Sequence, residues 1–319
     1  MSKQIFYIDP LEKLVTKKDS SLLLAHEMKA RGKDVYILFK SDLFICSSSA
    51  DVTINCHTFI SSRADDFYLK SFELLKKVDV TITAQDTIHM RLEPPFDLTY
   101  MRSLWLLNFI KDQTNCNVIN DPLGIMKNNE KVTSFLAKSH IDTFVGQAVG
   151  PFMTFVQKLR DHGEQNLILK PLDLFQGIGV QKVSLDQSNE ELMDLFQRYS
   201  QEHDGQVVAQ PFLKEVSSGE IRAIFYDRKL IGAIKKIPTE GSYLANIAQG
   251  ATFSKTKLSQ EELESCHHVC DILGEKVPWV AFDIIGGRIS EVNITCPGLL
   301  VEVSKAMNLN LAAEIESLV

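Results

Sequence analysis

Short apolar segments alternate with helical patterns through the first 120 residues, and this alternation restricts the fold more than any other feature of the chain. One helical pattern, SSLLLAHEMKARG, begins where Ser20 can cap a helix and ends at Gly32, and another lies near 98–111. Strands separated by helices are typical of an open parallel sheet covered on both faces. We therefore predict an α/β domain over residues 1–120, although 41–75 fits neither pattern. The apolar segments are IFYI (5–8), VYILF (35–39), VDVTIT (78–83) and NVIN (117–120).

The pattern changes at about residue 121, where antiparallel hairpins replace the alternation. The segment IRAIFYDRKLIGAIKK predicts two strands joined at Asp227 and Arg228, and a polar loop follows at 238–255. We therefore predict an α+β second half with a central subdomain at 121–205 and a C-terminal subdomain at 206–319. The other expected elements are helices near 128–138, 151–161, 189–200 and 259–274, strands at 167–171 and 207–212, a hairpin at 280–295 and a final helical segment.

The charge of the chain excludes several kinds of partner. The net charge is −7 with a pI of about 5.7, and no basic run or basic–aromatic interleaving occurs. Nucleic acid is therefore not expected as a partner.

No apolar run approaches the length of a membrane span, and no basic leader precedes an apolar stretch at the start. We expect a cytoplasmic protein without membrane contact.

The six cysteines are scattered, and reduced thiols are expected in a chain of this length. The closest pair, Cys266 and Cys270 in CHHVC, suggests a metal site. However, both share one helical face with Leu263 and Leu273, and cysteine is commonly buried. We therefore favour the core face of a helix over a zinc site, which would need paired CxxC spacing.

The segment FDIIGGRISEVNIT (282–295) reads as two strands around a Gly-Gly turn, yet it carries Asp283, Glu291 and Asn293. Glu291 and Asn293 are two residues apart and therefore share one face of their strand, and Asp283 lies on the neighbouring strand. Three oxygen donors on one patch suit Mg²⁺ or Mn²⁺ bound together with phosphates. The alternative is the solvated face of an amphipathic hairpin.

Several other segments can be interpreted either as ligand contacts or as ordinary structural or solvated residues. Lys170 ends the apolar strand LILK, where it could reach into a cleft or be solvated. Arg222, two residues from Glu220, could contact an anion or form a surface ion pair. AQPFL (209–213) could pair its backbone with an adenine edge or act as a connector, and Lys131 in NNEKV, on an expected helix, carries no signal alone. FQGIG is not a Walker A loop, and no G-x-G-x-x-G opens a helix, which argues against a Rossmann dehydrogenase.

Taken together and in this order, these segments resemble the bacterial glutathione synthetases of the ATP-grasp superfamily, nearly from end to end. KKDSS and MRLEPPFD (90–97), read as an arginine-containing loop, resemble the family's N-terminal motifs. NNEK, LILKPLD, AQPFL, IRAIFYD and FDIIGGRISEVNITCP follow at the family's spacing. The resemblance implies an ATP-grasp fold behind an open parallel-sheet domain, and a homo-oligomer.

The resemblance also implies a reaction and a role for each residue. ATP would phosphorylate the carboxylate of γ-glutamylcysteine, and glycine would attack the acyl phosphate, with release of ADP and phosphate. The loop at 238–255 would close to keep water from the acyl phosphate. The implied catalytic residues are Arg222 and Asn246; the ATP contacts are Lys131, Lys170, Gln210, Pro211, Phe212 and Leu213; the contacts to the acceptor peptide are Lys18, Asp19, Ser20 and Arg91; the ligands of Mg²⁺ or Mn²⁺ are Asp283, Glu291 and Asn293.

Three departures from the family pattern lie near the substrate end. After KPLD the family has glycine, whereas this chain has the bulky sequence LFQ (174–176) where backbone should approach phosphate. Leu244 stands where the family has an arginine two residues before Asn246, and GLLV replaces the arginine-containing segment ahead of Glu302. Two lost arginines mean fewer anchors for carboxylates. The alternatives are therefore an ATP-grasp ligase for another acid or amine, and a non-catalytic nucleotide-binding paralogue.

Overall fold

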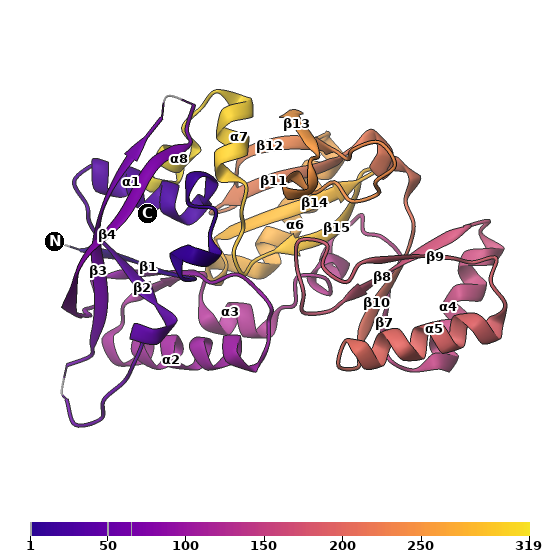
Figure 1. The fold of residues 1–319 in the computed structure, drawn as a ribbon, viewed down its shortest axis with the longest axis horizontal. Helices are drawn as coiled ribbons and strands as arrows, with labels where there is room; N and C mark the ends of the chain where they lie inside the picture. The colour runs from indigo at the N-terminus through magenta and orange to yellow at the C-terminus, as the bar shows by residue number, and fades with distance from the viewer. Residues whose placement is uncertain (1, 50, 65) are drawn as a thin grey trace.

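The computed structural model describes residues 2–49, 51–64 and 66–319, and it contains three β-sheets in an elongated molecule (Figure 1). The six-stranded sheet lies at one end, the four-stranded sheet at the other, and the five-stranded sheet between them. No helix within the described ranges is long and apolar enough to cross a membrane.

The N-terminal sheet is mixed, so the prediction of a parallel sheet is only partly correct. Its order is β4-β3-β2-β1-β5-β6, in which β2, β1, β5 and β6 are parallel and β3 and β4 form an antiparallel hairpin at one edge. The segment VDVTIT is the end of β4 rather than a parallel strand. β4 is largely exposed and carries several lysines, as edge strands commonly do, which hides its strand pattern. The bounds are β1 Lys3–Ile8, β2 Asp34–Phe39, β3 Thr53–Arg63, β4 Leu69–Thr81, β5 Thr87–Arg91 and β6 Asn117–Ile119.

The helices of this domain begin at aspartates. α1 (Ser20–Ala30) is capped by Asp19, whose carboxylate accepts the Leu22 backbone N–H at 2.8 Å, so the prediction of Ser20 as the cap is off by one residue. α2 (Leu98–Thr114) is capped by Asp97 in the same way. The chain leaves α1 through Gly32, whose φ of +84° suits glycine, as expected.

The helix expected near 128–138 does not form. α3 (Pro122–Lys127) ends at Asn128, and only a short 3-10 turn, Thr133–Leu136, follows. The side chain of Asn129 accepts the backbone N–H groups of Lys131 at 3.0 Å and Val132 at 3.2 Å. This local side-chain turn competes with helix formation, so Lys131 lies in a turn rather than on a helix.

The central sheet is antiparallel, in the order β7-β10-β8-β9, and α4 and α5 pack against it. The Phe152 and Phe196 rings stack between the two helices with centroids 3.9 Å apart. The boundary expected at residue 206 precedes β10, which pairs with β7 and β8, so we propose that the central subdomain extends to the end of β10. The bounds are β7 Phe144–Gly146, α4 Val149–Asp161, β8 Asn166–Pro171, β9 Gln181–Ser184, α5 Asn189–Glu202 and β10 Val207–Pro211.

The C-terminal sheet, β13-β12-β11-β14-β15, contains both predicted hairpins. Asp227 and Arg228 have φ of +45° and +63°, the left-handed conformation of a tight hairpin turn. Cys266 and Cys270 lie in the core between α6 and the sheet, which confirms the core-face interpretation of that helix. The bounds are β11 Glu220–Tyr226, β12 Lys229–Ile237, β13 Thr252–Lys255, α6 Gln260–Leu273, β14 Trp279–Ile285, β15 Arg288–Asn293, α7 Leu300–Met307 and α8 Leu311–Glu316.

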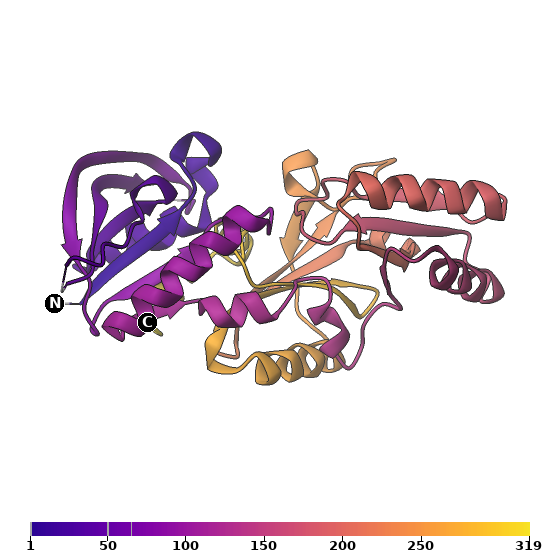
Figure 2. The ribbon, with the colours of Figure 1, turned by 90° about the horizontal axis from the view of Figure 1, so that it is seen from below.

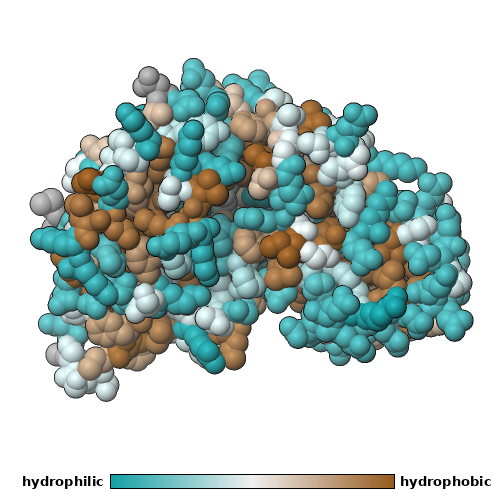
Figure 3. Space-filling view, viewed as in Figure 1, coloured by the Kyte–Doolittle hydropathy of each residue, from teal (hydrophilic) through white to brown (hydrophobic). Residues whose placement is uncertain are grey.

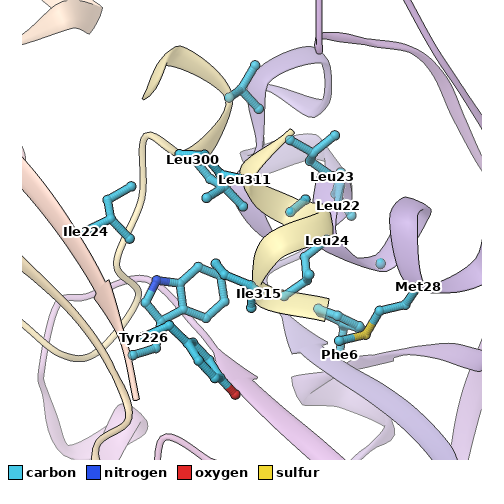
Figure 4. Packing of buried hydrophobic residues seen from close by; sticks show 14 of the residues in the cluster. Phe6, Leu22, Leu23, Leu24, Met28, Ile224, Tyr226, Leu300, Leu311 and Ile315 are labelled. Carbon is cyan, nitrogen blue, oxygen red and sulfur yellow. The ribbon is translucent and has the colours of Figure 1, made fainter. Parts of the chain in front are cut away.

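One hydrophobic core joins the two ends of the chain. Leu22 of α1, Leu311 of α8 and Ile224 of β11 belong to the same buried cluster (Figure 4). Glu316 of α8 also pairs with Arg31, with 2.7 Å between the charged atoms. The C-terminal helices therefore pack between the N-terminal domain and the C-terminal sheet.

Candidate active site

Every residue predicted for the site lines one cavity of about 870 Å³. The recess at the centre of Figure 3 is bordered by hydrophobic side chains. All three sheets contribute to the lining. The predicted residues that line it are Lys18, Asp19, Ser20, Arg91, Lys131, Lys170, Gln210, Pro211, Phe212, Leu213, Arg222, Asn246, Asp283, Glu291 and Asn293.

Arg222 and Asp283 form a buried ion pair in this cavity. They are register partners on β11 and β14, and two hydrogen bonds of 2.9 and 2.7 Å join the guanidinium to the carboxylate. Burial alone would raise the pKa of Asp283, but Arg222 and Lys236 outweigh it and hold the pKa well below its usual range. Asp283 is therefore ionised, and the surface ion pair of Arg222 with Glu220 that we left open is not formed.

Lys236 extends this pair into a network. Its ammonium group donates to Asp283 at 3.1 Å and also to Glu220, its register partner across the β11–β12 hairpin. Burial raises the pKa of Glu220 to about 7, and Lys236 opposes that rise. We did not predict Lys236 or Glu220 as site residues. The hairpin turn at 227–228 alone would pair Glu220 with Lys235, because a bulge between Ile224 and Phe225 shifts the register by one residue, and the sequence does not reveal this bulge.

Asp283, Glu291 and Asn293 lie on one patch, as predicted, because a bulge in the β14–β15 pairing brings Asp283 onto the face of Glu291 and Asn293. Asp283 and Glu291 are register partners, and the Asn293 amide donates to Asp283 at 3.2 Å. Asp283 is only 5% exposed, so this patch is not the solvated face of a hairpin. Two carboxylates and an amide oxygen fit Mg²⁺, which takes one or two carboxylates together with phosphate oxygens.

Lys131 reaches the same patch from a turn. Its ammonium lies 3.3 Å from the Glu291 carboxylate and donates to the Leu174 carbonyl at 2.6 Å. The neighbouring Glu130 fixes this turn, because it accepts the backbone N–H groups of Ile294 at 2.8 Å and Thr295 at 2.9 Å. Lys131 is thereby held between the central and C-terminal sheets. Glu130 is a further lining residue that our sequence analysis missed.

Lys170 approaches the patch from the end of β8. Burial lowers the pKa of Lys170, the nearby Glu291 raises it and Lys131 lowers it further. Two lysines from different segments thus lie near Glu291, and Lys131 pairs with it. This arrangement concentrates positive potential where an anionic ligand can enter.

The segment Gln210–Leu213 forms one wall of the cavity. The Gln210 side chain donates to Thr143 at 2.9 Å, and the Lys182 ammonium lies over the Phe212 ring, 3.8 Å from its centroid. The buried side chains of Ile141 and Ile168 also line the cavity. This wall is therefore an apolar slot with strand backbone along one edge, which suits a flat aromatic base.

Two loops meet over the cavity. The Asn246 amide donates to the Gln176 carbonyl at 2.8 Å. Gly177 has a φ of +77°, and a Cβ there would lie 3.2 Å from the Leu244 side chain. The polar loop expected at 238–255 is irregular to residue 251 and ends in β13. Leu244, in place of the family's arginine, packs against the glycine loop.

The residues predicted to contact the peptide substrate surround Arg91. Arg91 is the last residue of β5 and is 3% exposed, so it lies on a buried strand rather than in a loop. It donates to the Ser21 hydroxyl at 2.9 Å and the Pro297 carbonyl at 2.7 Å, and it lies 3.9 Å from the Trp279 ring centroid. Ser20 accepts the Leu300 backbone N–H at 3.0 Å and so positions the start of α7.

Two family models match the chain. The model described as "Prokaryotic glutathione synthetase, N-terminal domain" matches residues 2–125, and "Prokaryotic glutathione synthetase, ATP-grasp domain" matches residues 130–308. The chain is 28% identical over 315 residues to a glutathione synthetase of Parasynechococcus marenigrum, which covers 97% of this chain and 96% of the relative. It is 30% identical over 290 residues to that of Agrobacterium fabrum, with 90% and 86% covered.

Solved structures with the same fold include the D-cycloserine synthetase DcsG, with a TM-score of 0.68 at 13% identity over 98% of this chain and 99% of that chain. The ATP-grasp ligase PsnB, complexed with a phosphomimetic variant of its minimal precursor, Mg and ADP, has a TM-score of 0.61 at 13% identity, with 98% and 96% covered. The predicted ATP-grasp fold is confirmed, with a mixed rather than parallel N-terminal sheet.

Proposed function

The chain belongs to the prokaryotic glutathione synthetase family and is an ATP-dependent ligase, and from this premise we propose that it joins γ-glutamylcysteine to glycine. One observation carries the proposal: cations, carboxylates and an apolar slot converge from all three sheets on a single cavity. The predicted cations and carboxylates line this cavity together, which favours a catalytic ligase over the non-catalytic paralogue.

The chemistry requires activation of a carboxylate, because a carboxylate does not react with an amine. Lys131 and Lys170 would hold the phosphates of ATP, and Arg222 would stabilise the charge that spreads over the transferred phosphoryl group. Bound Mg²⁺, held by Asp283, Glu291 and Asn293, would supply further neutralisation of phosphate charge.

Arg222 would change partners during this step. In the described structure its guanidinium is occupied by Asp283. A phosphoryl group offers the same geometry of paired oxygen atoms to a guanidinium. We therefore infer that Arg222 exchanges the carboxylate for phosphate when nucleotide and metal enter.

The loop at 238–251 would protect the acyl phosphate. Its contact from Asn246 to the Gln176 carbonyl supports a closed position over the cavity. Exclusion of water matters here because water would hydrolyse the acyl phosphate. Leu244 adds apolar surface to this cover and offers no anchor for a carboxylate.

A second candidate function is an ATP-grasp ligase for another acid or amine. Leu244 packs against Gly177, and Val301, directly before Glu302, is fully buried in the shared core. Neither position presents a cation to the cavity. The missing cations would therefore reduce the binding of glycine, which has a carboxylate, more than the binding of an amine without one.

The deciding experiment is phosphate release from ATP and Mg²⁺ by the purified full chain. It would be run with γ-glutamylcysteine and glycine together and with each omitted, and the product mass would be read. Release that needs both substrates and yields the mass of glutathione supports the first function. Release that needs γ-glutamylcysteine and an amine other than glycine supports the second.

We also infer a homo-oligomer, with a candidate interface on α2. Leu98, Trp105 and Phe109 are 58%, 54% and 44% exposed, and they fall on one helical face with the exposed Arg102 and Asp112. We call these five residues the α2 seam. Figure 2 shows α2 in front of the N-terminal sheet with no other element over it. In Figure 3, brown side chains are visible at the lower left, where Figure 1 places α2.

The order of residues along the α2 seam suits a second copy of the same helix. An antiparallel pair with its two-fold axis near residue 107 brings Arg102 of each helix beside Asp112 of the other. It also brings Trp105 beside Phe109. Such self-complementarity is what a two-fold interface between identical chains requires.

A further inference from the structure

Glu302 is a buried carboxylate that no part of the predicted site uses. It lies in the first turn of α7 and is 2% exposed, yet it lines the cavity. Its Oε2 atom is buried and has no hydrogen-bond partner among the described residues. Within the same ranges, no lysine or arginine nitrogen lies within 4.0 Å of this carboxylate.

Two other carboxylates that line the cavity, those of Asp283 and Glu130, are only 5% and 8% exposed, and both are satisfied. Asp283 is bound by Arg222, and Glu130 by backbone N–H groups. Leaving a carboxylate buried without a partner is strongly unfavourable. A buried carboxyl oxygen without a partner, in a ligand cavity, therefore points to a ligand that completes it.

The position of Glu302 is fixed from several sides. Ser20 binds the N-terminus of α7, and Ile247, next to Asn246, packs against the core that contains Leu300. Glu302 thus lies between the segment Lys18–Ser20, which is predicted to contact the peptide substrate, and the loop that covers the cavity. The titratable or charged groups that face it are Lys18, Asp19, Tyr68 and Arg222.

These surroundings raise the affinity of the Glu302 carboxylate for a proton. Burial raises the pKa of Glu302, a backbone hydrogen bond lowers it, Lys18 and Arg222 lower it, and Asp19 raises it. A carboxylate whose pKa lies above its usual range is a better proton acceptor at neutral pH than an exposed one. The acceptor amine arrives as an ammonium at this pH and must lose a proton before it can attack.

We propose that Glu302 binds the ammonium group of the acceptor and takes its proton, a role that rests on the proposed ligase function. An N–H bond breaks, and the proton forms an O–H bond on the Glu302 carboxyl. The freed lone pair forms the C–N bond to the acyl phosphate carbon. The C–O bond to phosphate then breaks, and phosphate leaves with that electron pair and with the second proton from nitrogen. Glu302 returns its proton to water when product leaves.

The test compares two nucleophiles in Glu302→Gln. Hydroxylamine is uncharged at neutral pH and reacts with acyl phosphates without a base, whereas glycine must be deprotonated. We expect kcat with glycine to fall about 100-fold, and hydroxamate formation to stay within about threefold of wild type. The loss with glycine should shrink toward alkaline pH, where more of the glycine is already neutral.

Equal losses with both nucleophiles would overturn the proposal, because Glu302 would then act on acyl phosphate formation or on the fold. An unchanged kcat with glycine would overturn it too. Glu93→Gln is the matched comparison, since Glu93 is a half-buried carboxyl on the same cavity, and burial raises its pKa to about 7. If only Glu93→Gln shows the selective loss with glycine, the proton acceptor is Glu93.

The products that the wild-type protein forms with hydroxylamine and with glycine distinguish a failure of this proposal from a failure of the proposed function. A γ-glutamylcysteine hydroxamate without glutathione would mean that the donor is correct and the amine is not. A hydroxamate from another acid only would overturn the proposed donor. In either case Glu302→Gln is then compared with hydroxylamine and the true amine, and the same selective loss is required.

Discussion

Arg222 and Asp283 face each other on β11 and β14 and are joined by two hydrogen bonds, although 61 residues separate them in the sequence. Asp283 is also the carboxylate that the family resemblance assigns to metal. A metal ion held by Asp283 would compete with the Arg222 guanidinium for this carboxylate. Under the proposed function, such competition would couple nucleotide entry to the position of Arg222.

The stability of the pair can be measured with Asp283→Asn. We expect the free energy of unfolding to fall by about 3 kcal/mol, because Arg222 is left buried without its partner. Urea denaturation gives the value. The surface pair of Arg288 with Glu215, 3.1 Å apart and 35% and 50% exposed, provides the control. Glu215→Gln should cost less than about 1 kcal/mol, and equal losses in the two variants would contradict this account.

Lys170→Met should weaken nucleotide binding. Lys170 and Lys131 both line the cavity near Glu291, where phosphates would enter. We expect the KM for ATP to rise at least about tenfold and kcat to fall, because a phosphate contact is lost in a buried site. Steady-state kinetics at varied ATP measures both. Lys158→Met removes an exposed lysine of α4, 53% exposed, and should leave both constants unchanged.

Leu244→Arg tests whether the altered loop sets the acceptor preference. An arginine at this position would place a cation beside Gly177, where a carboxylate of the acceptor could reach it. The ratio of kcat/KM for glycine over that for glycinamide should rise about tenfold. Leu244→Met keeps the packing without the charge and should leave the ratio unchanged. A ratio that rises equally in both variants would show that loop packing, not charge, controls the preference.

The α2 seam predicts a charge-dependent oligomer. Arg102→Asp and Asp112→Arg should each shift the oligomer toward monomer, because like charges would then meet across the two-fold axis. The double variant should restore the oligomer. Light scattering after size-exclusion chromatography measures the mass. Glu261→Arg, on the exposed face of α6, is the control. A wild-type monomer at all concentrations would end this proposal.

His89 should contribute to acid unfolding. Burial, with Arg91 and Lys33, lowers the pKa of His89 to about 3, and its ring stacks on Phe6 and hydrogen-bonds Gln4. Because the folded pKa lies below the unfolded value of about 6.5, the unfolded chain binds the extra proton. Stability from His89 is thus full above pH 6.5 and is lost as pH falls toward 3.

Urea unfolding between pH 6.5 and pH 4 checks the His89 prediction. The slope of the unfolding free energy against pH should be smaller in His89→Gln than in wild type, by up to about 1.4 kcal/mol per pH unit. A slope that does not change would mean that His89 is protonated in the folded protein.

The elements that could be predicted are those with a strong local pattern. The hairpin turn at Asp227 and Arg228 follows from turn residues between two apolar runs, and α6 follows from its helical spacing. The shared face of Glu291 and Asn293 follows from the two-residue period of a strand. Asp283 joins that face only because a bulge shifts the β14–β15 register between Asp283 and Ile284, and local periodicity does not give this shift.

The elements that could not be predicted depend on partners far away in the sequence. β4 is an edge strand with an exposed, lysine-rich face, so its pattern resembles a loop. The turn around Lys131 exists because Asn129 and Glu130 bind backbone groups, some of them more than 160 residues away. Glu302 could not be predicted as a site residue, since only the packing of α7 against Ser20 places it at the cavity.

The packing of α8 against α1 has a consequence for synthesis of the protein. The ribosome releases the N-terminal domain long before residues 311–316, which cover α1 in the finished structure. Until then the apolar face of α1, with Leu22 and Met28, has no cover from the C-terminal end of the chain. We expect that face to be the surface that a chaperone holds during translation. We expect a protein truncated before α8 to be degraded by proteases and to have no ligase activity.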